Sequence, residues 1–204
     1  MVRLVQGHQV YNVDNKASNQ KAYSQLKDLQ LSKPVVPGRS AWFKYRTGEF
    51  YSTLTMPRSE DIYVDGCCLR NGQDGATAGV GVYFGPNDSR NVSQPLYGQQ
   101  TNQRAELKAA VEAVRLGDRS SDLNIHTDSK YVVDGVNSYS NRWERNGWTN
   151  ANGAPVANQD LFTQLKDSIN RHPGQVNIKY VPGHSGIQGN EYADRLAKNG
   201  ARKY

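Results

Sequence analysis

The sequence has no long hydrophobic run and very little cysteine. No apolar stretch approaches the ~20 residues that a membrane-spanning helix needs, and the first residues contain no apolar core like that of a secretory signal. The two cysteines, Cys67 and Cys68, are adjacent, so in a strand they would point to opposite faces and would be poor disulfide partners. We therefore expect no membrane association and a reducing intracellular compartment: the nucleus, the cytoplasm or the mitochondrion.

The sequence also has no excess of positive charge outside its first 58 residues. The net charge is +6, and residues 1–58 contain nine Lys and Arg against three Asp and Glu, whereas the remaining residues contain sixteen of each. A basic segment either binds a polyanion through phosphate contacts or is a solvated leader, and both interpretations stay open. A chain of 204 residues suffices for one domain and an appendage, so we expect a basic N-terminal extension over 1–58 and a folded domain over 59–204.

Segments with regular apolar spacing begin near residue 60. Short apolar runs predict strands, and longer segments with apolar residues at helical spacing predict helices. The first three strands are close enough to form antiparallel hairpins, while the later ones are separated by helices and must cross over to pair in parallel. We expect an α/β fold with a mixed sheet covered by helices, and a polar loop over 141–157. The predicted strands are 61–67, 78–85, 91–100, 123–128 and 175–181, and the predicted helices are 101–117, 129–139, 158–172 and 190–204.

Four acidic residues lie on or beside these elements: Asp65, Glu106, Asp128 and Asp194. Each has a simpler explanation: Asp65 precedes a glycine as in a turn, Glu106 lies where a negative charge favours a helix N-terminus, Asp128 could cap the following helix, and Asp194 could pair with Lys198 four residues later. Brought together, however, the carboxylates would repel one another unless a cation neutralised them, and no lysine is expected among them. Oxygen ligands favour Mg²⁺ or Mn²⁺, and two such ions can activate a water and stabilise a leaving oxygen in phosphodiester cleavage.

The segment "VPGHSGIQGNEYADRLA" (181–197) places His184 among glycines, just before a helix that we expect to begin near Asn190 and to carry Asp194. The glycines predict a mobile loop. A histidine there is either a solvated side chain or a group that transfers a proton, since histidine changes charge near neutral pH.

Four segments in register resemble a type 1 ribonuclease H: "YVDGCCLRNG", "TNQRAELKAA", "IHTDSKYVV" and "VPGHSGIQGNEYADRLA". The resemblance runs from about residue 61 to the C-terminus and identifies 59–204 as a ribonuclease H catalytic domain. It implies the ribonuclease H fold, a five-stranded mixed sheet with helices on both faces. It also implies endonucleolytic hydrolysis of the RNA strand of RNA–DNA hybrids, which leaves 5′-phosphate and 3′-hydroxyl ends.

The resemblance also implies roles for single residues. Two Mg²⁺ ions, or Mn²⁺ in their place, would be held by the four acids, and no organic cofactor is expected. His184 would assist proton transfer or product release. The partner would be an RNA–DNA hybrid duplex, bound by a monomer. For Trp143 and Trp148, packing in the core is the alternative to contact with the duplex. The implied catalytic residues are Asp65, Glu106, Asp128, His184 and Asp194; the RNA-strand contacts are Asn71, Asn102 and Gln103; the DNA-strand contacts are Thr101, Tyr139, Trp143, Trp148 and Asn158. Of the last group, Thr101 and Asn158 match a pocket of the family that binds a DNA phosphate.

Two other functions stay open: a nucleic-acid-binding protein of this fold with weak catalysis, and a ribonuclease H domain derived from a retroelement. The sequence also departs from the family pattern. The segment 141–153 contains few bases, and Gln99 stands where a basic residue is often found. We expect the basic extension to supply the grip on nucleic acid that the neutral domain lacks.

Overall fold

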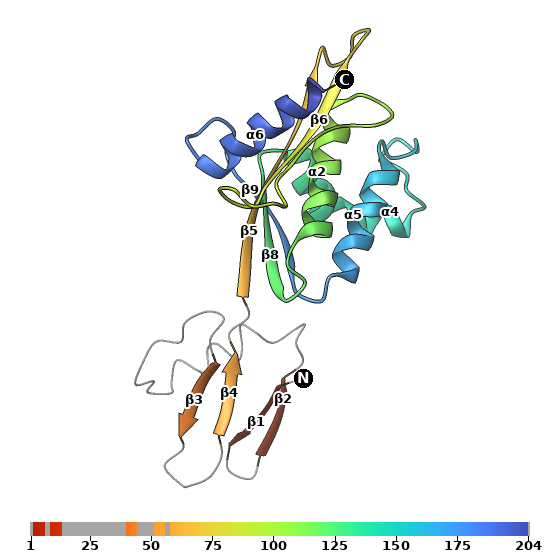
Figure 1. Ribbon diagram of the computed structural model, residues 1–204. Coiled ribbons are helices and arrows are strands. Elements are labelled where there is room, and N and C mark those ends of the chain that lie inside the picture. Colours follow the sequence, from red (N-terminus) through yellow and green to blue (C-terminus); the bar gives the residue numbers. More distant parts are fainter. Residues whose placement is uncertain (1, 7–8, 14–39, 45–50, 56–57, 204) are drawn as a thin grey trace. The chain divides into compact units, whose positions relative to one another are not determined.

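The computed structural model describes residues 2–6, 9–13, 40–44, 51–55 and 58–203. The chain divides into two compact units, Met1–Arg58 and Ser59–Tyr204 (Figure 1). In the first unit, β1 (Val2–Gln6) pairs antiparallel with β2 (Gln9–Val13), and β3 (Ser40–Lys44) pairs antiparallel with β4 (Tyr51–Thr55).

The second unit is built on one five-stranded sheet with the strand order β7-β6-β5-β8-β9. The first three strands in sequence form antiparallel pairs, β5 with β6 and β6 with β7, whereas β8 and β9 are parallel. The predicted mixed sheet is therefore confirmed. The bounds are β5 (Arg58–Leu69), β6 (Thr77–Tyr83), β7 (Val92–Pro95), β8 (Ser121–Thr127) and β9 (Val176–Tyr180).

Helices cover the sheet on both sides, with α2 and α5 side by side on one face and α6 on the other (Figure 1). Within the described residues, every helix is too short or too polar to cross a bilayer. The bounds are α2 (Asn102–Leu116), α3 (Lys130–Asp134), the π-helical turn η1 (Gly135–Tyr139), α4 (Ser140–Arg145), α5 (Gln159–Arg171) and α6 (Gln188–Ala201).

The prediction of a loop starting at residue 141 was wrong, because α3, η1 and α4 make one helical stretch over 130–145. The aromatic Trp143 packs edge-on against Phe162 of α5, with 5.1 Å between ring centroids. This contact gives the polar segment an apolar anchor, so the helix continues where composition alone favours a loop.

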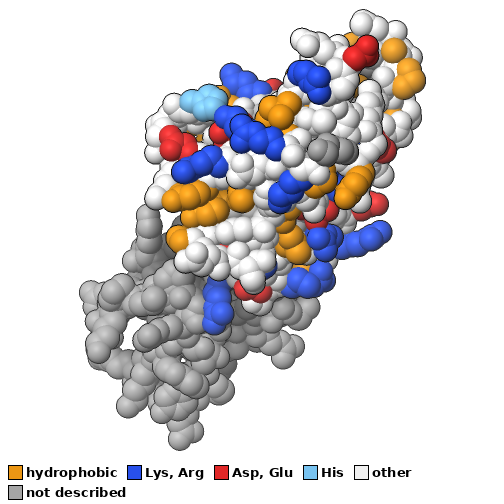
Figure 2. Space-filling view, turned by 45° about the horizontal axis from the view of Figure 1, so that its top comes forward, with side chains coloured by type: hydrophobic (Ala, Val, Ile, Leu, Met, Phe, Trp, Pro, Cys, Tyr) orange, Lys and Arg blue, Asp and Glu red, His pale blue; other side chains and the backbone are white. Residues whose placement is uncertain are grey.

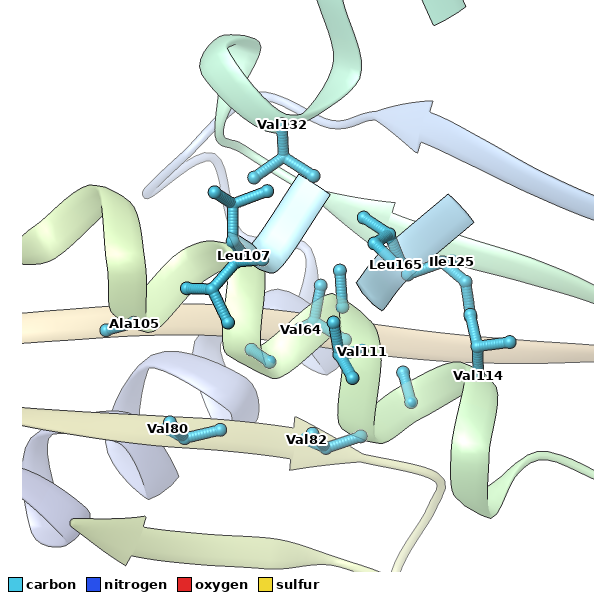
Figure 3. Close-up of a cluster of buried hydrophobic side chains, with 14 of the residues drawn as sticks. Val64, Val80, Val82, Ala105, Leu107, Val111, Val114, Ile125, Val132 and Leu165 are labelled. Atoms are coloured by element: carbon cyan, nitrogen blue, oxygen red, sulfur yellow. The ribbon is translucent and has the colours of Figure 1, made fainter. Parts of the chain in front are cut away.

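The core lies between the sheet and the α2–α5 face, and Figure 3 shows side chains from β5, β6, β8, α2, α3 and α5 converging there. Side chains alternate along β6: Val80 and Val82 are fully buried toward α2, whereas Gly79 and Gly81 face α6. Burying each such side chain stabilises the fold by roughly 1.5–3 kcal/mol. The labelled core residues are Val64, Val80, Val82, Ala105, Leu107, Val111, Val114, Ile125, Val132 and Leu165.

Glycines let α6 lie directly on the backbone of β6. A Cβ atom at Gly79 would be 2.1 Å from the backbone nitrogen of Ala201, and one at Gly81 would be 2.2 Å from the carbonyl oxygen of Ala193. Any side chain at these two positions would push the helix away. The close packing fixes the position of α6 and therefore of the acid that it carries, Asp194.

Candidate active site

Asp65 lies within a strand and not in a turn, so the turn explanation for this residue was wrong. The following residue, Gly66, has a different purpose, because a Cβ there would be 2.1 Å from the backbone nitrogen of Glu106 and 2.4 Å from the carbonyl carbon of Ala105. The glycine allows the first turns of α2 to touch β5. This close approach places Glu106 near Asp65.

The Asp65 carboxyl is 8% exposed and accepts a hydrogen bond of 2.8 Å from the backbone N–H of Gly66. Burial raises its pKa to about 8, assisted by the negative charges of Asp128, Asp194 and Glu106 and opposed by the Gly66 hydrogen bond. Three acids from three other segments therefore act on one buried carboxyl. Chain folding has brought the other three predicted acids into electrostatic range of Asp65.

Glu106 accepts two hydrogen bonds, one of 2.5 Å from Ser129 Oγ and one of 2.7 Å from Asn102 Nδ2. Burial raises the pKa of Glu106, the Ser129 hydrogen bond lowers it, and the charge of Asp128 raises it further. Ser129 is also the N-cap of α3, since its side chain accepts from the Val132 N–H. The capping explanation for Asp128 was therefore wrong, and the Asp128 carboxylate is not engaged as the helix cap.

Asp128 directly follows β8 and accepts a hydrogen bond of 3.0 Å from Asn190 Nδ2. Helix α6 begins at Gln188, close to the predicted start, and Asn190 lies buried in its first turn and is not the cap residue, which is Ile187. Sequence reasoning missed this residue as part of the site. The available signal was its spacing, because Asn190 and Asp194 are four residues apart and so lie on one helix face.

Asp194 pairs with Lys198, at 2.7 Å between Oδ2 and Nζ. The expectation that no lysine lies among the acids was wrong for this residue, and the simpler explanation of an ion pair along the helix is confirmed. The Lys198 side chain is 42% exposed, so the pair is of the solvent-screened kind that contributes roughly 0.3–0.5 kcal/mol.

His184 lies in the turn between β9 and α6, and its side chain is exposed. The turn is attached at its start by the Val181 N–H, which donates to the Thr127 carbonyl. At Gly183 it passes so close to Asp128 that a Cβ would be 2.7 Å from Oδ2. His184 therefore follows directly after the residue at which the turn passes Asp128. The mobility of the turn stays a prediction.

The acids do not by themselves form a coordination shell. Within residues 58–203, no group of three or more His, Cys, Asp and Glu side chains is arranged to hold a metal ion. Each carboxylate instead accepts a hydrogen bond from a protein donor: Asp65 from Gly66, Glu106 from Ser129 and Asn102, Asp128 from Asn190, and Asp194 from Lys198. The donor set still fits a hard divalent cation, because burial and the charges of the neighbouring acids raise the pKa of Asp65, and a bound cation would stabilise its charged form.

The predicted RNA-strand residues lie at the edge of this cluster. Asn71 Oδ1 accepts a hydrogen bond of 3.2 Å from the Asn102 N–H, and Asn102 Oδ1 accepts one of 3.1 Å from the Cys68 N–H. Gln103 is exposed in the first turn of α2. Asn71 and Asn102 are therefore brought together beside Glu106, with amide groups that can both donate and accept.

The predicted phosphate contacts, Thr101 and Asn158, meet through a residue that sequence reasoning missed. Thr101 is the N-cap of α2 and accepts from the Arg104 N–H, and the Arg104 guanidinium donates to Asn158 Oδ1 at 3.3 Å. Asn158 precedes α5 in the left-handed conformation, with φ of 58°, and its Nδ2 donates to the Tyr131 hydroxyl at 3.0 Å.

The predicted aromatic contacts form one row, in which Trp143 lies 5.7 Å from Tyr139 and 6.1 Å from Trp148 between ring centroids. Both tryptophans are partly buried against the core, so the core-packing alternative is confirmed for part of each ring. Tyr139 is 49% exposed. On the face shown in Figure 2, Lys and Arg side chains are interspersed with Asp and Glu, as expected for a unit without excess charge.

Comparisons with known proteins agree with the geometry. Residues 57–202 match the family model described as RNase H. The chain is similar to Ribonuclease H1 of Mus musculus, with 41% identity over 150 residues that cover 72% of this chain and 52% of the relative. It is also similar to Ribonuclease H of Schizosaccharomyces pombe, with 44% identity over 182 residues that cover 89% of this chain and 62% of the relative. The chain thus spans about half the length of the mouse relative.

A bacterial relative and two solved structures extend the comparison. Ribonuclease HI of Haemophilus influenzae is 36% identical over 146 residues, which cover 72% of this chain and 92% of the relative. The structure of LC9-RNase H1, described as a type 1 RNase H with the type 2 active-site motif, has a TM-score of 0.55 and 32% identity over 72% of this chain and 73% of that one. A foamy viral protease-reverse transcriptase solved with double-stranded DNA has a TM-score of 0.60 and 27% identity, over 71% of this chain and 95% of that one.

Proposed function

The chain belongs to the RNase H family, and we propose that it is an endoribonuclease that hydrolyses the RNA strand of RNA–DNA hybrids. The observation that carries the proposal is the buried Asp65 carboxyl, on which the charges of Asp128, Asp194 and Glu106 act together. A cluster of this kind costs stability, and it sits where the matched family model covers the chain. We take residues 59–204 as the catalytic domain and 1–58 as a basic extension.

The four acids would bind two Mg²⁺ ions, with Mn²⁺ as a substitute. Carboxylate oxygens are the ligands that these ions prefer, and the charge of the ions would offset the burial and the neighbouring negative charges that raise the pKa of Asp65. When bound, the ions would lower the pKa of an attacking water and stabilise the leaving oxygen. The protein donors now on Glu106 and Asp128, which are Ser129, Asn102 and Asn190, would hold those two carboxylates in a fixed orientation.

Hydrolysis would form a bond between a water oxygen and phosphorus while the bond from phosphorus to the 3′-oxygen breaks. The products are a 5′-phosphate and a 3′-hydroxyl, and the leaving oxygen takes up one proton. His184 suits this transfer, because it is exposed and lies next to Gly183, where a Cβ would be 2.7 Å from Asp128 Oδ2.

Strand discrimination would depend on the 2′-hydroxyl, which only the RNA strand carries. Glu106 and the amides of Asn71, Asn102 and Gln103 lie together at the start of α2 and offer acceptors and donors for that group. Thr101, Asn158 and the row of Tyr139, Trp143 and Trp148 would bind the DNA strand.

The extension would add affinity for the hybrid. The similarity to the yeast relative covers 182 residues, more than the catalytic domain contains, so it continues into the first 58 residues. These residues hold the whole net positive charge of the chain. Phosphate contacts from such a segment would raise affinity and its dependence on salt.

The experiment that tests the function is cleavage of a labelled RNA–DNA hybrid with Mg²⁺ or Mn²⁺, beside double-stranded DNA and double-stranded RNA. Cleavage of the RNA strand of the hybrid alone, abolished by Asp128→Asn and retained by the exposed control Asp134→Asn, would support the proposal. Binding of the hybrid without cleavage in either ion would overturn it in favour of a binding protein of this fold. Origin from a retroelement is the weaker alternative, because identity to the foamy viral chain is 27% against 41–44% for the mouse and yeast relatives.

A further inference from the structure

A cluster of polar side chains outside the acid site joins the start of α2 to the start of α5. At its centre is the guanidinium of Arg104, whose side chain is only 17% exposed. Its Nη1 and Nη2 donate to the two carboxylate oxygens of Asp160 at 2.9 and 2.6 Å, and Nη1 also donates to Asn158 at 3.3 Å. The Asp160 side chain, by contrast, is 61% exposed and closes the cluster on its solvent side.

We propose that Asp160 is an internal anion that competes with a phosphate of the DNA strand for Arg104. The inference rests on the proposed function, in which Thr101 and Asn158 bind that phosphate. Arg104 contacts both residues, through its backbone N–H to Thr101 Oγ1 and through Nη1 to Asn158 Oδ1. A phosphate that reaches these two residues therefore arrives beside the guanidinium that Asp160 holds.

The chemistry of the pair favours exchange. A guanidinium binds a carboxylate and a phosphate through the same two-pronged arrangement of N–H groups, so the Asp160 carboxylate stands where a phosphate would bind. The Asp160 side chain is exposed, so its carboxylate can leave the guanidinium toward solvent. The Arg104 side chain is mostly buried and also contacts Asn158, so its guanidinium would stay in position while the bound anion changes.

Displacing Asp160 would leave its charge stabilised in another way. Asp160 lies in the first turn of α5, where the unpaired N–H groups of the helix favour a negative charge. The hydrogen bond from Arg104 holds the pKa of Asp160 below its usual value, and the Leu161 N–H lowers it further. The contribution of the Leu161 N–H does not depend on Arg104, so it offsets part of the cost of exchanging the partner.

The contact also sets the orientation of the Asn158 amide. Arg104 is a donor only, so it takes the amide oxygen, and the Nδ2 group is directed to the Tyr131 hydroxyl with a second N–H to spare. A phosphate offers only acceptors, so this is the orientation that a phosphate requires. Arg104 thus serves as a positioning residue for Asn158. Asp160 partly neutralises the charge of Arg104 and so weakens the attraction of the site for a phosphate.

The test compares the full chain with Asp160→Asn, Arg104→Gln/Asp160→Asn and Asp167→Asn. Asp167 is exposed on the same helix, so its variant loses the same charge away from the cluster. Hybrid binding is measured by fluorescence anisotropy without divalent metal at a series of salt concentrations. We expect Asp160→Asn to bind about fivefold more tightly at low salt than Asp167→Asn, with a salt slope steeper by about 0.9, the value for one added phosphate contact.

The gain should vanish in the double variant. It should also vanish for Asp160→Asn when one DNA phosphate, found by scanning, is replaced by an uncharged methylphosphonate. Thermal denaturation checks folding, and Asp160→Ser, which keeps a hydroxyl at the start of α5, replaces the asparagine variant if that variant melts early. Affinity and salt slope equal to those of Asp167→Asn in a folded Asp160 variant would overturn the inference and leave a purely structural ion pair. Failure of the proposed function is separate, because the unmodified chain would then not cleave the hybrid.

Discussion

Substitution of Asp65 by asparagine should stabilise the metal-free protein, and increasingly so as the pH rises. Burial and three neighbouring acids raise the pKa of Asp65 from 3.8 to about 8. Below about pH 4 the carboxyl is protonated in both the folded and the unfolded chain, and the shift costs nothing. Between about pH 4 and about pH 8 only the folded chain holds the proton, so the free energy of unfolding falls by up to about 1.4 kcal/mol per pH unit.

The asparagine side chain is neutral at every pH and has no such loss. The difference in unfolding free energy between Asp65→Asn and the unmodified chain should therefore grow by roughly 2–3 kcal/mol from about pH 5.5 to about pH 7.5. Urea denaturation in the presence of a chelator measures both free energies, and the exposed Asp134→Asn serves as the control for a general charge effect.

Addition of Mg²⁺ should make the unmodified chain more stable than Asp65→Asn. The ion stabilises the charged form of the cluster, so it should raise the unfolding free energy of the unmodified chain more than that of the variant, which lacks one ligand. If the unfolding free energies of the variant and the unmodified chain changed in parallel over this pH range without metal, the claim that the fold disfavours the ionised form of Asp65 would be refuted.

Three further outcomes are expected. Gly66→Ala places a Cβ 2.1 Å from the backbone nitrogen of Glu106, so α2 must move. The substitution should cost about 1–3 kcal/mol of stability in urea denaturation, and it should reduce kcat while changing KM less. An unchanged kcat would contradict this. Asn190→Ala removes the donor to Asp128 and should lower kcat/KM about tenfold in the hybrid assay, with Asn199→Ala, exposed on the same helix, as the control. Deletion of residues 1–58 should raise KM and flatten its dependence on salt, and identical kinetics at all salt concentrations would remove any role of the extension in binding.

Much of the catalytic unit was predictable from residue patterns. Apolar spacing identified the strands and most helices, because buried faces impose a period of two or 3.6 residues on the sequence. The pattern failed for residues 141–145, where the helix depends on the contact between Trp143 and Phe162, which are far apart in the chain. The acids and His184 were selected because their residue types and order are typical of one family; the comparisons confirm the family, and the roles of these residues stay a prediction.

The arrangement around the acids was not predictable, because it depends on which surfaces meet. Gly66 looked like part of a turn and instead lets α2 touch β5, and Asn190 looked like a helix start and instead donates to Asp128. The pair of Arg104 and Asp160 joins residues 56 positions apart and leaves no local pattern. Periodicity records only whether a side chain is buried, whereas these contacts depend on the distance between two backbones, which packing of the whole unit sets.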